Sequence, residues 1–356
     1  MDKSILIHVG PPKSGTSAIQ FALNLHRNSL KSDGILYPEH EIGPNGISSG
    51  NLSVILDMND DGKWVVSKSK LQSLMEAFEE SKLQKLLLSS EYFFYLIPEL
   101  AEVIPTAKFI AYIRCPMETY ESAYNQSVKR HGRTQVAQFG KNLHTTTLDI
   151  LQKSMEEVEK DRFVLRAYLP AHTEDFDLVE DFFKALSFNI SLTDKHVTNT
   201  SYSYEALETK RWFNQFDLGP LEKQLDQILQ SYSSGTVKFS LLPETLFTRY
   251  RKQSLQYLKH FFRQVKVANA KKLLGLLSEQ KTYHFKEQNL KETEFIEVAG
   301  FIESYSSTFY QTLLDSLKTD LPIDRPEFLD YLVKKRTNTL KLIFDRILSR
   351  VKKSFK

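Results

Sequence analysis

The stretch "ILIHVGPPKSGTSAIQFAL", residues 5–23, decides the fold of this chain. Four of the five residues from Ile5 to Val9 are apolar or β-branched, which predicts a short buried strand. The loop Gly-Pro-Pro-Lys-Ser-Gly follows, and a helical pattern begins after it. A glycine-bounded loop between a strand and the N-terminus of a helix predicts an anion site, because free backbone N–H groups and the helix dipole both favour negative charge there.

The loop differs from the ATP-binding form of this motif, G-x-x-x-x-G-K-[ST]. That form requires lysine where this chain has Thr16, and the nearby lysine, Lys13, stands inside the loop. Gly10 and Gly15 allow the backbone to turn tightly and approach a ligand closely. An ordinary Gly-Pro turn is the alternative for a bare pair of glycines. We expect the donors around a bound phosphate to come from Lys13, Ser14, Gly15, Thr16 and Ser17.

Short apolar runs alternate with helical patterns through the first half of the chain. This alternation predicts an α/β fold with a mostly parallel central sheet and helices on both faces. The loops that follow the strands then meet at one edge of the sheet, where such folds bind ligands. The expected strands are Ile5–Val9, Gly34–Tyr37, Lys85–Ser89, Lys108–Ile113 and Arg162–Tyr168, and the expected helices span about 15–26, 70–82, 94–103, 117–130, 145–158 and 174–188.

The pattern changes after about residue 200, where helices and loops continue without clear strand alternation. We therefore expect three consecutive parts. Residues 1–200 form the α/β core, and residues 201–330 form a helical extension that is a candidate for acceptor binding. Residues 331–356 form a basic amphipathic helix.

Composition narrows the class of protein. The 356 residues are 41% apolar, and 47 basic against 44 acidic residues give a net charge of +3, too mild to indicate nucleic-acid binding. The single cysteine, Cys115, excludes an internal disulfide and a cysteine-rich metal site. The first residues already form a predicted strand, and no apolar run reaches the roughly 20 residues of a spanning helix. These features predict a cytoplasmic protein.

A second constellation lies in "IRCPMETYESAYNQ", residues 113–126. Arg114 ends a predicted strand, Pro116 enforces a turn, and Ser122 lies two turns into the next helix. An arginine fork with a hydroxyl suits a second phosphate. Taken alone, Arg114 could form a surface ion pair and Ser122 a solvated helix position. Together with the first loop, they indicate a nucleotide phosphorylated at two positions.

These two segments resemble the nucleotide-binding motifs of sulfotransferases. "PKSGTSAIQ" is similar to their 5′-phosphosulfate loop, in which lysine stands inside the loop and threonine follows the second glycine. "IRCPMETYESAYNQ" is similar to their 3′-phosphate segment, with Arg114, Pro116, Ser122 and Tyr124 at the matching positions. The spacing resembles that of the glycosaminoglycan-type enzymes and their bacterial relatives. The resemblance covers roughly residues 1–190.

The resemblance implies a three-layer fold like that of P-loop nucleoside triphosphate hydrolases, and the donor 3′-phosphoadenosine 5′-phosphosulfate (PAPS). It also implies that the product is adenosine 3′,5′-bisphosphate (PAP), with no metal required. Lys13 would neutralise the charge that grows on the bridging oxygen of the leaving group. The donor would be bound by Lys13, Ser14, Gly15, Thr16, Ser17, Arg114 and Ser122.

The resemblance also implies a general base for the acceptor hydroxyl. Glycosaminoglycan sulfotransferases use a glutamate near the end of a central strand, and "LLLSSEYFFYL" places Glu91 just after the strand Lys85–Ser89. The alternative for Glu91 is a carboxylate that caps the next helix. His40, in the long loop "HEIGPNGISSGN", is the second candidate, because other sulfotransferases use histidine; the alternative is an exposed loop residue. No spacing of His, Asp and Glu indicates a metal site.

The tail "YLVKKRTNTLKLIFDRILSRVKKSFK", residues 331–356, carries nine basic residues and one acid, Asp345. Its apolar residues follow helical spacing. One interpretation is a basic amphipathic helix in peripheral contact with the inner face of a membrane. The other is a terminal helix docked on the protein with solvated lysines.

The sequence therefore predicts a PAPS-dependent sulfotransferase that acts on a hydroxyl of a carbohydrate or glycolipid, most simply a bacterial enzyme. A P-loop small-molecule kinase using ATP and Mg²⁺ shares the strand-loop-helix start, although Thr16 at the lysine position opposes it. A nucleotide- or glycan-binding protein without catalytic activity would keep the phosphate sites and lack a base.

Overall fold

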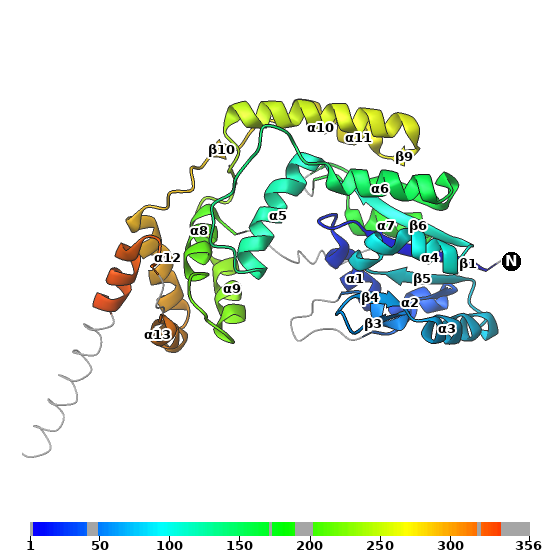
Figure 1. Ribbon diagram of the computed structural model, residues 1–356, viewed down its shortest axis with the longest axis horizontal. Helices are drawn as coiled ribbons and strands as arrows, with labels where there is room; N and C mark the ends of the chain where they lie inside the picture. The colour runs from blue at the N-terminus through cyan, green and yellow to red at the C-terminus, as the bar shows by residue number, and fades with distance from the viewer. Residues whose placement is uncertain (1–2, 41–48, 171–172, 189–201, 319–321, 336–356) are drawn as a thin grey trace, which may run out of the picture. The chain divides into compact units, whose positions relative to one another are not determined.

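The computed structural model describes residues 3–40, 49–170, 173–188, 202–318 and 322–335 (Figure 1). The chain divides into two compact units, and each unit is formed by three separate stretches of the sequence. The sheet unit comprises Met1–Tyr120, Lys141–Thr198 and Thr248–Lys281. The helical unit comprises Glu121–Gly140, Asn199–Phe247 and Thr282–Lys356. Each unit has its own hydrophobic core and is described by itself below.

The sheet unit is built on a six-stranded sheet in the order β2-β5-β1-β6-β7-β9. Every neighbouring pair in this sheet is parallel. The predicted α/β class with a mostly parallel central sheet is therefore confirmed. The strands are β1 (Ser4–Gly10), β2 (Ile35–Leu36), β5 (Lys85–Ser89), β6 (Ala107–Ile113), β7 (Phe163–Ala167) and β9 (Val267–Ala268).

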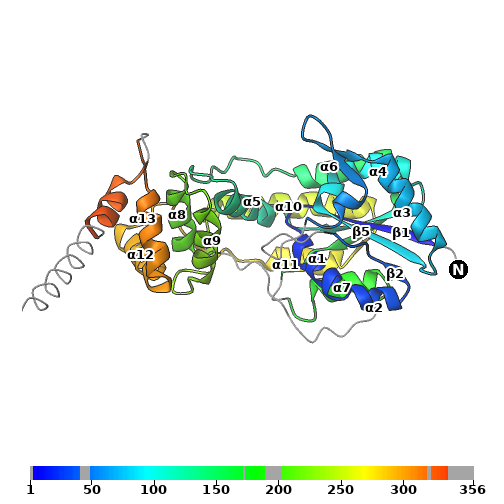
Figure 2. The same ribbon diagram turned by 90° about the horizontal axis from the view of Figure 1, so that it is seen from below.

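Helices cover both faces of this sheet (Figure 2). On one face α1 (Thr16–Leu25) packs beside α7 (Leu178–Ala185), and on the other α4 (Ile97–Val103) packs beside α6 (Thr146–Glu157). The α1 face buries a cluster that joins helix and strand side chains. Its members include Ile19, Leu23, Leu87, Ile110, Phe182 and Phe183. In the central strands β1, β5 and β6, apolar side chains on both faces are buried, as in a parallel sheet covered by helices on both sides.

The chain reverses its direction of travel across the sheet at β1. After β1 it passes to β2 and β5 on one side, then crosses to β6 and β7 on the other. The carboxyl ends of β5, β1 and β6 therefore lie next to one another. In parallel sheets a reversal of this kind leaves a crevice beyond the strand ends, where ligands bind. Glu91, the 10–15 loop and Arg114 all follow these three strands directly.

Two of the predicted element boundaries need correction. The helix expected over 94–103 is preceded by a 3₁₀ helix, η2 (Glu91–Leu96), before α4 begins at Ile97. The strand expected over Gly34–Tyr37 shortens to Ile35–Leu36. The remaining helices of this part of the chain are α2 (Arg27–Ser32), α3 (Lys68–Glu80) and α5 (Pro116–Arg130), with short 3₁₀ turns η1 (Leu52–Val54) and η3 (Lys160–Arg162).

The expectation that the second half of the chain lacks strands is wrong. β9 pairs with β7 and completes the main sheet, so residues 248–281 belong to the sheet unit. They also supply α11 (Ala270–Glu279) and most of α10 (Glu244–Gln264). The predicted division at residue 200 misses this return, because a two-residue strand between two helices leaves no alternation to detect. A hairpin, β3 (Leu56–Met58) with β4 (Trp64–Val66), was also not predicted.

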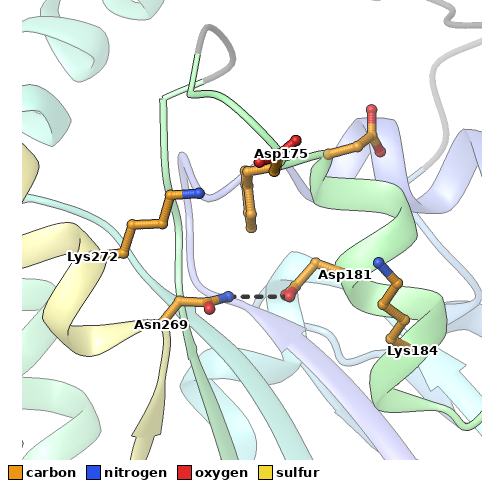
Figure 3. Close-up of a pocket in the computed structure, with 7 residues that line it drawn as sticks. Asp175, Asp181, Lys184, Asn269 and Lys272 are labelled. Carbon is orange, nitrogen blue, oxygen red and sulfur yellow. Dashed lines mark hydrogen bonds between the residues drawn. The ribbon is translucent and has the colours of Figure 1, made fainter.

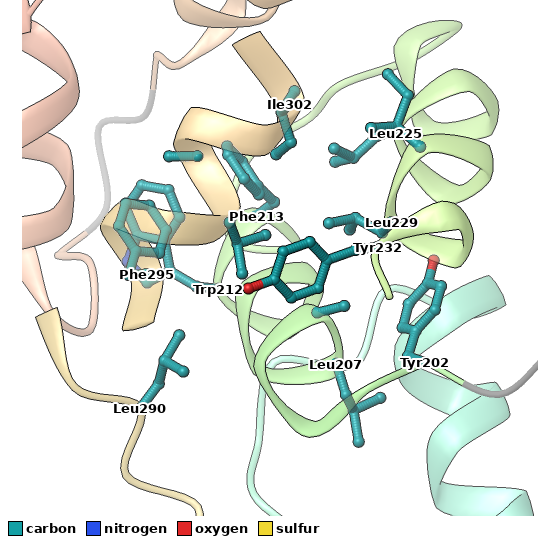
Figure 4. Close-up of a cluster of buried hydrophobic side chains, with 14 of the residues drawn as sticks. Tyr202, Leu207, Trp212, Phe213, Leu225, Leu229, Tyr232, Leu290, Phe295 and Ile302 are labelled. Atoms are coloured by element: carbon teal, nitrogen blue, oxygen red, sulfur yellow. The ribbon is translucent and has the colours of Figure 1, made fainter. Parts of the chain in front are cut away.

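The helical unit surrounds a core of aromatic and aliphatic side chains (Figure 4). Trp212 lies among Phe213, Phe216, Phe295 and Phe328, with ring centroids between 5.0 and 5.9 Å from its own. The helices of this unit are α8 (Tyr204–Phe213), α9 (Leu221–Ser231), α12 (Glu292–Tyr305) and α13 (Ser307–Ser316), and β8 (Phe239–Ser240) pairs with β10 (His284–Phe285).

The predicted terminal helix over 331–356 is described only in part. Residues 326–335 are helical, and residues 336–356 lie outside the described residues. In the described part of the tail, Lys335 forms an ion pair with Glu303. Among the helices that the structure describes, none combines the length and the apolar character needed to cross a bilayer.

Candidate functional site

The loop between β1 and α1 forms the centre of the candidate site. Gly15 has a φ of 83°, a left-handed conformation that favours glycine, and a Cβ atom there would lie 2.1 Å from Leu178 Cδ2. Lys13 also has a positive φ, of 68°. The Ser14 hydroxyl donates to the carbonyl oxygen of Pro11 at 2.5 Å, which closes the turn from within. The loop is thus held in one shape by its own backbone and by packing.

The N-terminus of α1 is open to an anion. Gly15 is its N-cap, and in the described part of the chain no side chain caps the helix and no acidic residue stands in its first turn. The Thr16 hydroxyl is buried, and no described residue bonds with it. A buried hydroxyl without a partner costs free energy, and Thr16 shares this state with other described hydroxyls such as those of Thr209 and Tyr310. The predicted phosphate donors therefore lie at a helix N-terminus whose dipole favours a negatively charged group.

Arg114 lies against this loop. Its Nη1 atom donates to the carbonyl oxygen of Lys13 at 2.9 Å, and its Nε atom lies 3.3 Å from a carboxylate oxygen of Glu118. The guanidinium also stands over the ring of Tyr168, 4.9 Å from the ring centroid. The structure thus brings the two predicted phosphate-binding segments together through Arg114. Ser122, the second predicted residue of its segment, belongs with the later part of α5 to the helical unit, and its role stays a prediction.

Glu91 follows β5 and lies beside the first residues of the loop. A Cβ atom built on Gly10 would be 3.5 Å from the Glu91 Cα. Burial raises the pKa of the Glu91 carboxyl above its usual range, and the nearby charge of Lys13 acts in the opposite direction. The alternative capping role does not apply, because Ser90 caps η2 by accepting a hydrogen bond from the Tyr92 backbone N–H at 3.2 Å. Glu91 is therefore a half-buried carboxylate beside a lysine.

The backbone before Glu91 is fixed by residues that the sequence did not single out. Asn51 is fully buried. Its side-chain Oδ1 atom accepts a hydrogen bond from the Ser89 backbone N–H at 2.7 Å, and its backbone N–H donates to the Ser89 carbonyl at 3.0 Å. A Cβ atom on Gly50 would lie 1.8 Å from that carbonyl oxygen, so glycine is required. The Ser90 hydroxyl donates to the carbonyl of Ser49 at 2.8 Å. Residues 49–51 thus extend the edge of β5 where β2 has ended.

The two histidines near the site have different surroundings. His8, in β1, is fully buried, with Nδ1 2.8 Å from the Ser89 hydroxyl, and burial lowers its pKa to about 3. His40 lies 3.2 Å from the side-chain nitrogen of Asn24, in the last turn of α1. Asn24 is eight residues beyond Thr16, or about 12 Å along the helix. The structure therefore does not bring His40, the second candidate base, to the phosphate loop.

A small polar pocket lies beside the end of β9 and is lined in part by residues that flank Leu178 (Figure 3). Its volume is about 180 Å³, and several of its polar groups are engaged within the fold. Asp181 accepts hydrogen bonds from Arg166 Nε and Nη2 at 2.5 and 2.6 Å and from Asn269 at 3.2 Å. Asp177 caps α7, and Lys272 donates to the carbonyl of Glu174. We assign this network to the joining of β7, β9 and α7.

The sequence matches no model of a known protein family and no curated protein. Within the described residues, His, Cys, Asp and Glu side chains form no group of three that could hold a metal ion. The function of the chain therefore has to be argued from the site itself.

Proposed function

We propose that the protein is a PAPS-dependent sulfotransferase whose acceptor is a hydroxyl of a carbohydrate or glycolipid. One observation carries the proposal: Lys13, Thr16, Arg114 and Glu91 come from the ends of three adjacent parallel strands and lie around one uncapped helix N-terminus. Lys13, Thr16 and Arg114 offer positive charge and hydrogen-bond donors to a nucleotide that carries sulfate and phosphate. Sulfuryl transfer to a hydroxyl needs a base such as Glu91.

The donor fits the residues present. The unpartnered Thr16 hydroxyl and the open first turn of α1 supply neutral donors for phosphosulfate oxygens. Lys13 supplies a positive charge beside the same turn. Arg114 already contacts Glu118 through Nε and the Lys13 carbonyl through Nη1, and its Nη2 atom supplies a further charged donor for a phosphate oxygen. By its resemblance to the sulfotransferase motif, Ser122 stays the predicted partner of Arg114 for the 3′-phosphate.

Each residue then has a distinct chemical task. The acceptor oxygen forms a bond to sulfur as the bond from sulfur to the bridging phosphate oxygen breaks. Glu91 takes the proton that the acceptor hydroxyl loses, and its raised pKa makes it a stronger base than an exposed glutamate. Lys13 stabilises the negative charge that develops on the leaving phosphate oxygen.

Thr16 separates this proposal from the kinase alternative. A P-loop kinase places lysine at that position to bind the β- and γ-phosphates, and a hydroxyl after it to bind Mg²⁺. Here the position holds a buried threonine, and Lys13 precedes it by three residues on the opposite side of Gly15. The arrangement favours a donor that needs no metal bridge.

Ligand-induced stabilisation tests the donor. PAP at about a hundred times its dissociation constant should raise the free energy of unfolding by roughly 2.7 kcal/mol, through binding to the folded state alone. AMP, which lacks the 3′-phosphate, should stabilise less at the same concentration. Equal or greater stabilisation by ATP with Mg²⁺ would contradict the proposal and support a kinase.

The substitution Glu91→Gln tests catalysis separately from binding. It keeps the size of the side chain and removes its ability to accept a proton. We expect PAP stabilisation to remain and transfer of sulfate from PAPS to fall by about 10²- to 10⁴-fold. Unchanged transfer would show that Glu91 is not the base. A protein that binds PAP but shows no transfer in the parent form would be a binding protein.

A further inference from the structure

An aromatic corner stands directly beside Glu91 in η2. Tyr95 is 55% exposed, although its neighbours Phe93 and Phe94 are buried. The rings of Tyr92 and Tyr95 have centroids 6.3 Å apart and planes at 65°, so they form two walls of a corner. The buried ring of Phe94 packs edge-to-face against Tyr95, with ring centroids 5.5 Å apart and an angle of 78° between the planes. An exposed aromatic ring beside a candidate active site offers an apolar face on which a ligand can stack.

The corner and the carboxylate belong to the same short helix, and Glu91 directly precedes Tyr92. In a 3₁₀ helix, side chains three residues apart lie on the same side, which places Tyr92 and Tyr95 together. Glu91 is the first residue of the same short helix, and its charge, after burial, raises the pKa of the Tyr95 hydroxyl. Tyr95 therefore lies within electrostatic reach of Glu91. Since η2 packs against β1, the corner belongs to the strand ends that carry the phosphate loop.

The size and polarity of the corner indicate what it binds. Two tyrosine rings offer about 150–250 Å² each, far less than the roughly 1,200 Å² of a stable protein interface. Each ring carries a hydroxyl, and a carboxylate adjoins them, which disfavours an alkyl chain or lipid tail. A sugar ring matches: its C–H face packs on an aromatic ring, and its hydroxyls remain free to bond with polar groups at the edge.

Resting on the proposed sulfotransferase function, we propose that Tyr92 and Tyr95 form the acceptor subsite and stack a glycosyl ring so that one of its hydroxyls reaches Glu91. The subsite selects a ring with an apolar face, such as a glucoside or galactoside. Tyr95 supplies the main stacking surface and Tyr92 the side wall. Glu91 receives the hydroxyl that is to be sulfated.

Saturation-transfer NMR tests the subsite without requiring turnover. The PAP-loaded protein is examined with methyl glucoside, methyl galactoside, methyl N-acetylglucosaminide, cellobiose, lactose and, as an apolar alcohol, octanol. We expect at least one sugar to receive saturation on its ring C–H protons. Tyr95→Ala should weaken its binding about fivefold to tenfold, whereas Tyr95→Phe should retain it. Tyr257→Ala, which removes a 44% exposed tyrosine of α10, is the matched control and should bind as the parent does.

Three results would overturn the subsite. These are sugar binding that survives Tyr95→Ala, octanol binding without sugar binding, and no binding of any sugar in the panel. PAP stabilisation of each variant is measured alongside. If the parent protein binds PAP but shows no sugar binding that depends on Tyr95, the subsite alone is rejected. If the parent protein does not bind PAP, the proposed function itself is rejected.

Discussion

Buried polar groups have different surroundings in the core of the helical unit and at the strand ends of the sheet unit. In the helical unit, Glu208 accepts from Arg211 at 2.8 and 3.1 Å and from Gln288 at 2.7 Å. Asp226 is equally enclosed, between Arg130 at 2.7 Å and the hydroxyl of Tyr202. At the strand ends of the sheet unit, the buried Thr16 hydroxyl has no described partner, and Glu91 has a raised pKa.

The difference separates buried charges whose hydrogen bonds are made within the fold from polar groups that are still able to bond with a ligand. A buried ion pair with all its hydrogen bonds made is complete in the folded chain. A helix N-terminus without a cap and a carboxylate with a raised pKa gain by binding something else. We therefore expect the proposed chemistry at the sheet edge and a structural role for the buried ion pairs of the helical core.

The largest effect should come from breaking a complete pair in the helical unit. Glu208→Ala leaves the buried Arg211 without its carboxylate, which should lower the free energy of unfolding by about 3–5 kcal/mol. Trp212 lies in the same core, so denaturant titration followed by its fluorescence reports the loss. Lys153→Ala, which removes an exposed partner of Glu157 in α6, is the control and should cost less than about 1 kcal/mol. Equal costs for the two variants would refute the structural role of Glu208.

The next effect should appear only when ligand is present. Lys13→Gln removes the charge and keeps a side chain of similar length, so stability without ligand should change little. The affinity for PAP should fall by roughly 10- to 100-fold, the usual loss for a hydrogen bond to a charged group. Isothermal titration calorimetry measures it, with Lys13→Arg as the variant that keeps the charge. An unchanged affinity would show that Lys13 does not contact the ligand. The contrast between the strand ends of the sheet unit and the helical core would then lose its principal charged residue.

A smaller effect should follow from the support behind Glu91. Asn51→Ala leaves the buried Ser89 N–H without its acceptor, which should cost about 1–3 kcal/mol. Denaturant titration followed through Trp64 of β4 measures this loss. Asn59→Ala removes an exposed turn hydrogen bond to the Lys63 N–H and should cost less. A loss no larger than that of the control would mean that residues 49–51 do not fix the end of β5.

The sequence predicts the parts of the molecule that depend on local pattern. The strands of the first half are apolar runs bounded by turn residues, and the phosphate loop carries its glycines and lysine in consecutive positions. Both could be read because their physical cause lies within a few residues. Glu91 was found through its position after a predicted strand.

Other parts depend on contacts between distant residues. β9 is a strand because it pairs with the free edge of β7. Its two residues carry no local pattern that predicts a strand. α5 has a continuous helical sequence, yet its residues divide between the two units. Asn51 supports β5 from 38 positions away through its side-chain oxygen. Its only local signal is the Gly50–Asn51 pair at the end of a long loop, which does not reveal the partner.

The smallest effect, a dependence of stability on pH, tests Glu91 itself. Burial raises the pKa of Glu91 in the folded protein above its unfolded value, so folding favours the protonated carboxyl. Its contribution to stability is fully present below the unfolded pKa of about 4.3 and is lost as the pH rises through the folded pKa.

The variant Glu91→Gln has no titratable group at this position. The stability of this variant relative to the parent should therefore increase between pH 4 and pH 7, by about 1.4 kcal/mol for each unit by which the pKa is raised. Urea titrations of both proteins at a series of pH values measure the difference, with Glu99→Gln in α4 as the control. A constant difference would show that Glu91 titrates normally, and the contrast between the sheet edge and the helical core would then rest on the phosphate loop alone.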